Sequence, residues 1–192
     1  MDRRLEKGKE TREKILNTAL LIISEEGIKG LSARKIADRS QISKSNIFHH
    51  YTSLENLLEV ILNGLFADTL TNISLDSCIT LEAFFQLLGE MTFKLEGDEL
   101  TIYKALLSYY NEALFTLKYE KMIVQIKKEV SESFRNQLEK LSGKNIPPDL
   151  LETLTADLDG MGLHYMIEKD SDKYMRLWRL KTDMYIQYIN NL

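Results

Sequence analysis

Proline, cysteine and long apolar runs are all scarce in this chain of 192 residues. The only two prolines are adjacent, at Pro147 and Pro148, and the nine glycines are scattered, so most of the chain is free to form long helices. No apolar run reaches the ~20 residues that a membrane-spanning helix requires. We therefore expect a chain that does not associate with a membrane.

The single cysteine, Cys78, cannot form an internal disulfide and excludes a zinc site built from several cysteines. The first residues, MDRRLEKGKETREK, are charged, and no apolar segment of the signal-peptide type follows them. Together these features predict a cytoplasmic protein.

Charge is distributed unevenly along the chain. Residues 1–52 carry 11 Lys and Arg against 7 Asp and Glu, whereas residues 53–192 carry 14 against 22. The first segment therefore has a net charge of +4 and the second a net charge of −8. A basic segment can meet phosphates and an acidic body should stay off DNA, which predicts two domains, 1–52 and 53–192.

Apolar residues recur at spacings of three and four, and no segment has the alternation of a strand. We therefore predict an all-α fold of about nine helices. Their expected ranges are 11–26, 33–40, 44–50, a long helix from residue 54, then 81–96, 98–115, 117–141, 150–169 and 172–190.

The first three helices have the pattern of a helix-turn-helix, in which a tight turn joins the second helix to the third. Ala37 is small enough to let these two helices cross closely, and Ile36, Ile42 and Ile47 supply a shared core. The start of the third helix would then present polar residues to the major groove. The alternative is a small helical bundle with a polar surface.

The stretch TREKILNTALLIISEEGIKGLSARKIADRSQISKSNIFHHYTSLENLLEVIL, residues 11–62, resembles the DNA-binding domain of the TetR family of bacterial transcriptional regulators. The shared features are the TREKIL start, the glycine that ends the first helix, IA in the second, SK opening the third, then His-Tyr and Ser-x-Glu-x-Leu. The resemblance implies that the third helix enters the major groove while neighbouring residues hold the phosphates. The residues that it implicates in DNA binding are Ser32, Arg34, Ser43, Lys44, Ser45, Asn46, Phe48 and His49.

The sequence departs from the family pattern at four positions, Gln41, Asn46, Phe48 and Leu54. Gln41 replaces the usual turn glycine, so we expect it to adopt a less comfortable backbone conformation at modest cost. Phe48 and Leu54 replace a common tyrosine and a common lysine, which removes two groups that can hold phosphate. Basic residues before the first helix could compensate as a flexible arm, and the alternative for them is a solvated tail; they are Arg3, Arg4, Lys7 and Lys9.

His49 and His50 are adjacent, and neighbouring residues on a helix point ~100° apart. They therefore make a poor metal-binding pair, and we expect neither a metal nor a cofactor. His49 should face the DNA backbone, whereas His50 should pack inward beside Tyr51.

Aromatic residues cluster in the acidic segment, where residues 84–119 hold 8 of the 17 aromatics in the chain. Most of them could be ordinary core, but a helical domain lined by Tyr, Phe and Met can also enclose a small, largely apolar or aromatic ligand. The resemblance implies such an effector pocket between the middle helices. Its candidate residues are Phe66, Phe85, Leu88, Met91, Tyr103, Leu107, Tyr110, Met122, Ile126 and His164.

The last helix has two apolar stripes, which suggests burial against its own core on one side and against a second chain on the other. Gly160 and Gly162 in the preceding helix would permit the close approach of another helix. The resemblance implies a homodimer formed by the last two helices. The expected interface residues are Leu158, Met161, Gly162, Tyr165, Trp178, Tyr185 and Ile189.

These observations predict a dimeric, ligand-responsive regulator, most commonly a repressor in this family, that binds a two-fold symmetric operator on double-stranded DNA. An enzyme is disfavoured because the sequence contains no glycine-rich phosphate loop, no Gly-x-Ser-x-Gly elbow and no His-x-x-x-His pair. The remaining alternative is a helical adaptor whose degenerate helix-turn-helix no longer binds DNA.

Overall fold

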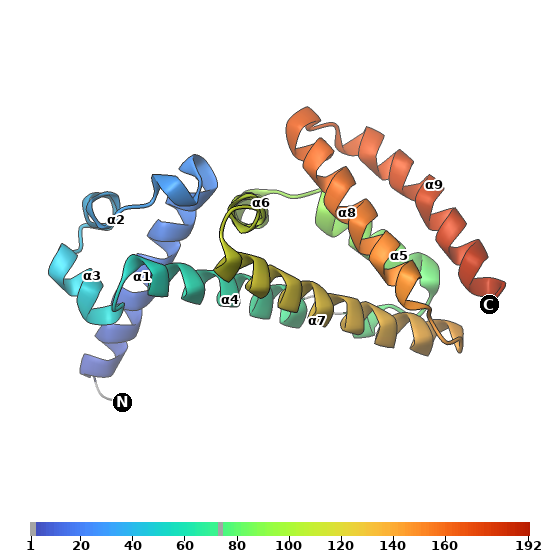
Figure 1. The fold of residues 1–192 in the computed structure, drawn as a ribbon, viewed down its shortest axis with the longest axis horizontal. Coiled ribbons are helices and arrows are strands. Elements are labelled where there is room, and N and C mark those ends of the chain that lie inside the picture. The colour runs from blue at the N-terminus through green and yellow to red at the C-terminus, as the bar shows by residue number, and fades with distance from the viewer. Residues whose placement is uncertain (1–2, 73–74) are drawn as a thin grey trace. The chain divides into compact units, whose positions relative to one another are not determined.

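A computed structural model of the chain describes residues 3–72 and 75–192, and within them the side chains other than those of residues 3–5, 66–72 and 76. These residues form nine α-helices and two short 3-10 turns and contain no strand, which confirms the all-α prediction (Figure 1). The elements are α1 (Arg3–Glu26), η1 (Ile28–Gly30), α2 (Ala33–Ser40), α3 (Lys44–His50), α4 (Leu54–Asn72), η2 (Leu75–Ser77), α5 (Leu81–Phe93), α6 (Gly97–Ala113), α7 (Leu117–Ser142), α8 (Pro148–Glu168) and α9 (Ser171–Asn190).

Most helix boundaries agree with the sequence pattern, and two do not. Helix α1 begins at Arg3 rather than at Thr11, so the basic residues expected in a flexible arm belong to its first turns. Helix α5 ends at Phe93 instead of Glu96, and Gly97 begins α6 with φ 52°. The segment between the two helices buries the side chain of Leu95.

The contacts within the chain divide it into two compact units. The first contains residues 1–69 and 97–121, and the second contains residues 70–96 and 122–192. Helix α6 therefore belongs to the same unit as the three N-terminal helices. The boundary expected between residues 52 and 53 does not coincide with a boundary between these units, and the division of function at that position remains a proposal.

The core of the first unit explains how α6 is attached to the N-terminal helices. Tyr51, which is fully buried, donates a hydrogen bond to the Arg12 carbonyl oxygen at 3.4 Å, and the Arg12 guanidinium lies 5.4 Å from its ring centroid. The Ser108 hydroxyl of α6 accepts a hydrogen bond from the backbone N–H of Ile28 at 2.9 Å. Burial of these polar groups is tolerated because each has a partner.

The second unit has an aromatic core in which α9 packs against α5. The Trp178 indole N–H donates to the Phe85 carbonyl oxygen at 2.7 Å, and the Phe85 and Tyr185 rings stack with centroids 5.5 Å apart. Any side chain at Gly89 would clash with the indole, because an added Cβ would lie 2.4 Å from Trp178 Cδ1. Among the described residues, no helix is long and apolar enough to span a bilayer.

Candidate DNA-binding interface

The turn between α2 and α3 is built from local hydrogen bonds. Gln41 has φ 57° and ψ 32°, the left-handed conformation expected from its place at the usual glycine position. Its side-chain amide donates to the Asp38 carbonyl oxygen at 2.7 Å, which helps to hold a conformation that costs most residues about 1 kcal/mol or more. The Ser40 hydroxyl is buried and accepts from the backbone N–H of Ile42.

Helix α3 begins at a capped end and buries a single side chain. The Ser43 hydroxyl accepts from the backbone N–H of Asn46 at 3.3 Å, which is the geometry of an N-cap. Ile47 is the only buried residue among the seven of this helix. The residues between positions 43 and 49 that are expected to meet DNA are all exposed, including Phe48, whose exposed fraction is 44%. They are Ser43, Lys44, Ser45, Asn46, Phe48 and His49.

The start of α2 presents the two other expected residues. Ser32 caps the helix, because its hydroxyl accepts from the backbone N–H of Lys35 at 3.3 Å. The Arg34 side chain is 81% exposed and its only ion pair in the described structure is a loose one with Asp38, with 3.7 Å between Nε and Oδ2. Arg34 can therefore turn to a phosphate at little cost.

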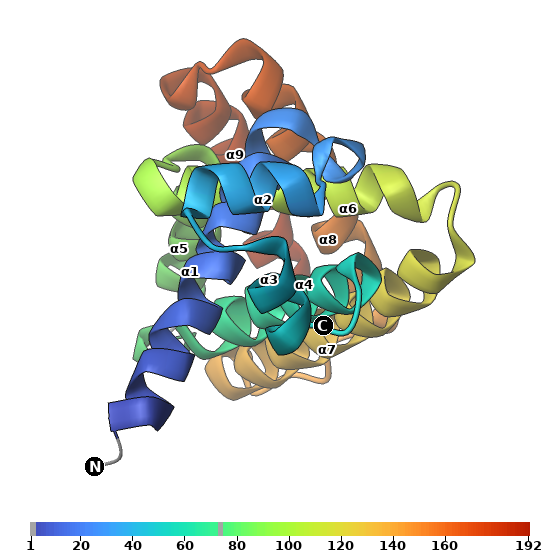
Figure 2. The same ribbon diagram turned by 90° about the vertical axis from the view of Figure 1, so that its left-hand side faces the viewer.

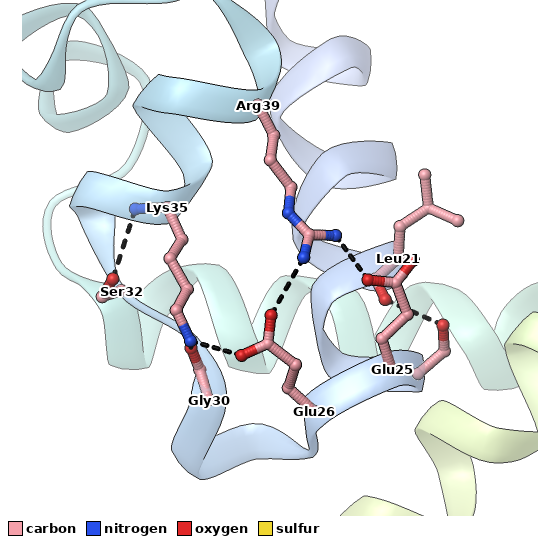
Figure 3. Close-up of polar contacts among 8 residues, drawn as sticks. Leu21, Glu25, Glu26, Gly30, Ser32, Lys35 and Arg39 are labelled. Atoms are coloured by element: carbon pink, nitrogen blue, oxygen red, sulfur yellow. Dashed lines mark hydrogen bonds and ion pairs between the residues drawn. The ribbon is translucent and has the colours of Figure 1, made fainter.

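Lys35 and Arg39 lie on a different face of α2 and reach toward α1 (Figure 3). Lys35 is paired with Glu26, while Arg39 contacts Glu25 at 2.5 Å and Glu26 at 2.9 Å. The hydrogen bond from Lys35 lowers the pKa of Glu26, and the hydrogen bond to Glu25 raises the pKa of Arg39. Both basic side chains are thus engaged within the protein, which the sequence pattern did not indicate because the partners are 9 to 14 residues apart.

A groove of about 870 Å³ lies between the first turns of α1 and helix α3. Helix α3 is the element of this pair drawn nearer the viewer in Figure 2. The basic first turns of α1 form one wall of the groove, and α3 forms the other. His49 is exposed and His50 is half-buried, with their ring centroids 5.5 Å apart. Its lining residues are Glu6, Lys7, Gly8, Glu10, Thr11, Asn46, His49 and His50.

The candidate effector residues fall in both units. Phe85, Leu88 and Ile126 are buried in the second unit, where Met91 and Met122 are half-buried and His164 is exposed. Tyr103, Leu107 and Tyr110 are half-buried in the first unit, and the side chain of Phe66 lies outside the described residues. Neither the groove beside α3 nor a shallow depression between α5 and α9 is lined by any of the ten.

The candidate dimer residues are mostly interior within one protomer. Gly162, Tyr165, Trp178, Tyr185 and Ile189 are buried, while Leu158 and Met161 are half-buried. Other apolar residues of the same two helices are exposed instead. These are Leu163 and Ile167 in α8, with Leu177, Leu180, Met184 and Tyr188 in α9.

Comparison with known proteins identifies the helix-turn-helix. The family model described as "Bacterial regulatory proteins, tetR family" matches residues 15–61, which run from the second half of α1 to the first turns of α4. The helix-turn-helix segment therefore belongs to the TetR family. This confirms the resemblance seen in the sequence.

Curated TetR-type relatives match over part of the chain. The repressor KstR2 of Rhodococcus jostii is 32% identical over 78 residues, which cover 38% of each chain. The biofilm operon regulator IcaR of Staphylococcus aureus is 28% identical over 96 residues, covering 48% of this chain and 51% of its own. The matches thus span about half or less of these relatives. Both relatives are transcriptional regulators rather than enzymes, in agreement with the sequence.

Solved structures share the fold over nearly the whole chain. A TetR-family regulator from Cytophaga hutchinsonii has a TM-score of 0.78 at 17% identity, covering 94% of this chain and 96% of its own. A transcriptional regulator from Saccharomonospora viridis, solved in complex with choline, has a TM-score of 0.75 at 18% identity, with coverages of 89% and 94%. The TetR fold therefore extends beyond the matched DNA-binding segment.

Proposed function

We propose that this protein is a dimeric, ligand-responsive transcriptional regulator, a repressor, that binds a two-fold symmetric DNA operator in the cytoplasm. The observation that carries the proposal is the first turn of α3, which is capped by Ser43 and leaves every side chain but Ile47 free of the core. A recognition helix of this motif reads base edges with its N-terminal residues. A second protomer presents the same helix to the other half-site.

The candidate residues differ in role according to their chemistry. Asn46 can form a paired hydrogen bond to adenine, and Phe48 can contact the methyl group of thymine. Lys44 and Arg34 can neutralise phosphates, and they position the protein without reading sequence. Ser32, Ser43, Ser45 and His49 supply further hydrogen bonds to the backbone or to base edges.

Substitutions at Lys44 and Asn46 test this division. We expect Lys44→Gln to weaken binding to all duplexes alike and to reduce the slope of log affinity against log salt by about 0.9, the value for one lost phosphate contact. Asn46→Ala should instead weaken binding only to the operator, by about 1–3 kcal/mol. The measurement is fluorescence anisotropy with the DNA upstream of the protein's own gene and with a duplex of arbitrary sequence.

The result for the unmodified protein decides between the proposal and the adaptor alternative. Salt-dependent binding to both duplexes, tighter for one, supports a regulator. Failure to bind either duplex at low salt would favour an adaptor with a degenerate helix-turn-helix.

The first turns of α1 are a second candidate contact with DNA. Lys7 lines the groove beside Asn46 and His49, so it lies next to the exposed face of α3. Deleting residues 1–9 should weaken DNA binding and flatten its salt dependence, because a cluster of cations is lost. Lys7→Gln should do the same on a smaller scale, whereas Lys14→Gln, on the same helix but outside the groove, should have less effect. Equal effects of the two single substitutions would argue against this contact.

The exposed apolar stripes of α8 and α9 support dimerisation through these helices. Leu180 and Met184 are each 64% exposed and Ile167 is 73% exposed, although residues of this kind are usually covered. Gly160 lies on the same face of α8 as Leu163 and Ile167, and an added Cβ there meets nothing within 4 Å. A helix from a second protomer can therefore approach α8 closely at this glycine.

A small-molecule effector is proposed to act through the helical body. Tyr103, Leu107 and Tyr110 are half-buried at spacings of four and three along α6 of the first unit, and an apolar and aromatic surface of this kind suits an apolar or aromatic ligand. Such a ligand shifts DNA binding only by preferring one of two conformations. Mass spectrometry of the denatured protein would identify a co-purified molecule, and a ligand that left DNA affinity unchanged would contradict an effector role.

A further inference from the structure

Helix α2 carries its charged residues on two separate faces. Arg34 and Asp38 share one face, whereas Lys35 and Arg39 share the face that meets α1. Residues four apart lie on the same side of a helix and adjacent residues point ~100° apart, so the Arg34–Asp38 pair and the Lys35–Arg39 pair point in different directions. The second face is occupied by contacts with Glu25 and Glu26, as Figure 3 shows.

These contacts form a continuous chain of ion pairs, which we call the α1–α2 latch and define as Glu25, Glu26, Lys35 and Arg39. Glu26 binds both cations, one with each carboxylate oxygen, and Arg39 also reaches Glu25. The Lys35 ammonium donates in addition to the Gly30 carbonyl oxygen at 3.0 Å. The two carboxylates balance the two cations, so the latch has no net charge.

The backbone around the latch is closely packed, which fixes where Glu26 points. A Cβ placed at Gly30 would lie 2.5 Å from Glu26 Cβ. The turn after α1 therefore folds tightly over this side chain. Exposed ion pairs add little to stability, so the main consequence of the latch is electrostatic.

The cations Arg34 and Lys44, at the starts of α2 and α3, lie outside the latch and are not held in close ion pairs in the described structure. Arg34 is largely exposed and only loosely paired, and Lys44 makes no ion pair within the part of the chain that the structure describes. Both lie at the starts of the helices expected to touch DNA. The basic N-terminal segment thus contains cations that are available to phosphates and cations that are already neutralised.

We propose that the α1–α2 latch withholds Lys35 and Arg39 from DNA phosphates and so determines operator specificity. The affinity of a protein for DNA of any sequence grows with the number of phosphates that the protein neutralises. The contacts that it makes with base edges do not depend on that number. Keeping two cations paired therefore lowers binding to arbitrary DNA without loss of the base contacts from α3. The inference rests on the proposed DNA binding and assigns a positioning role to two acidic residues.

Removing the carboxylates should strengthen nonspecific binding. For a duplex of arbitrary sequence titrated between about 50 and 200 mM salt, Glu26→Gln should steepen the slope of log affinity against log salt by about 0.9. Glu25→Gln with Glu26→Gln should steepen it by about twice that amount, which at 0.1 M salt corresponds to roughly eightfold tighter binding for each freed cation. Affinity for the operator should rise less, so the ratio of specific to nonspecific affinity should fall.

Matched controls separate the latch from a general change in charge. Glu13→Gln, alone and combined with Glu120→Gln, removes the same charges from exposed residues of the same unit that make no ion pair with a cation of α2 in the described structure. These variants should leave the slope nearly unchanged. Equal slopes for the latch variants and these controls would overturn the proposal.

The cations themselves provide a second test that does not depend on how the acidic variants fold. Lys35→Gln and Arg39→Gln should leave the slope of the unmodified protein unchanged, whereas Lys44→Gln should reduce it by about 0.9. A reduction of that size for Lys35→Gln or Arg39→Gln would show that they already contact phosphates, and the latch would be refuted. If the unmodified protein bound no duplex at low salt, the proposed DNA binding would fail instead.

Discussion

Leu180→Glu combined with Met184→Glu in α9 is expected to produce a folded monomer that binds a symmetric operator about 10²–10⁴-fold more weakly than the dimer. Both side chains are largely exposed in one protomer, so the substitutions remove little of its own core. A partner helix packed on this stripe would have to bury two carboxylates without counter-charges. Analytical ultracentrifugation should report the change in mass, and anisotropy with the operator the loss of affinity.

A matched control separates the stripe from the effect of added charge on α9. Arg179→Glu places a carboxylate on an exposed part of the helix outside both the buried face and the stripe. We expect this variant to remain dimeric. A monomer from Arg179→Glu, or a persistent dimer from the double variant, would argue against the α9 stripe as the interface.

Gly160→Leu in α8 offers an independent test with a distinctive pair of effects. The protomer leaves open space at this position, and leucine favours a helix over glycine by roughly 1 kcal/mol. The isolated protomer should therefore become more stable, while the bulk blocks the close approach of a partner helix. A rise in thermal stability together with dissociation is not expected from a substitution that damages the fold.

Much of the DNA-binding unit could be predicted from the sequence because its determinants are local. Ser32 and Ser43 were expected to precede helices, and both accept the hydrogen bond of an N-cap. Gln41 was expected to adopt an unusual backbone conformation, and its φ is 57°. Short-range patterns of this kind depend on a few neighbouring residues, so they can be predicted without knowledge of the tertiary contacts.

The features that the sequence did not give depend on contacts between distant residues. Helical spacing reveals two apolar stripes on α9, but only the packing of Trp178 against Phe85 and Gly89 shows which stripe is interior. Likewise, the pairing of Arg39 with Glu25 depends on the angle between two helices. From the sequence alone Arg39 and Glu25 are two free charges, whereas in the structure they neutralise each other.

Trp178→Ala is the second substitution with a large expected effect, and it should destabilise the second unit by about 3–5 kcal/mol. The indole is 1% exposed, contacts the rings of Phe85, Phe93 and Tyr185, and donates its N–H to a carbonyl oxygen. Trp178→Phe should cost less, because it keeps an aromatic ring in the core and loses chiefly the hydrogen bond. The measurement is denaturant unfolding followed by far-ultraviolet circular dichroism, which does not depend on the indole.

Combining these variants with Gly89→Ala tests whether the loss comes from the packing of α9 on α5. In the unmodified protein the added methyl group would meet the indole, so Gly89→Ala should cost about 1–3 kcal/mol through overpacking. In the Trp178→Ala background that clash is absent, and the better helix propensity of alanine should stabilise α5 by roughly 1 kcal/mol. The effect of one substitution should thus reverse its sign according to the residue at position 178. The same effect in both backgrounds would mean that α5 and α9 do not pack at this glycine. The argument that the exposed stripe of α9 is the dimer interface would then fail.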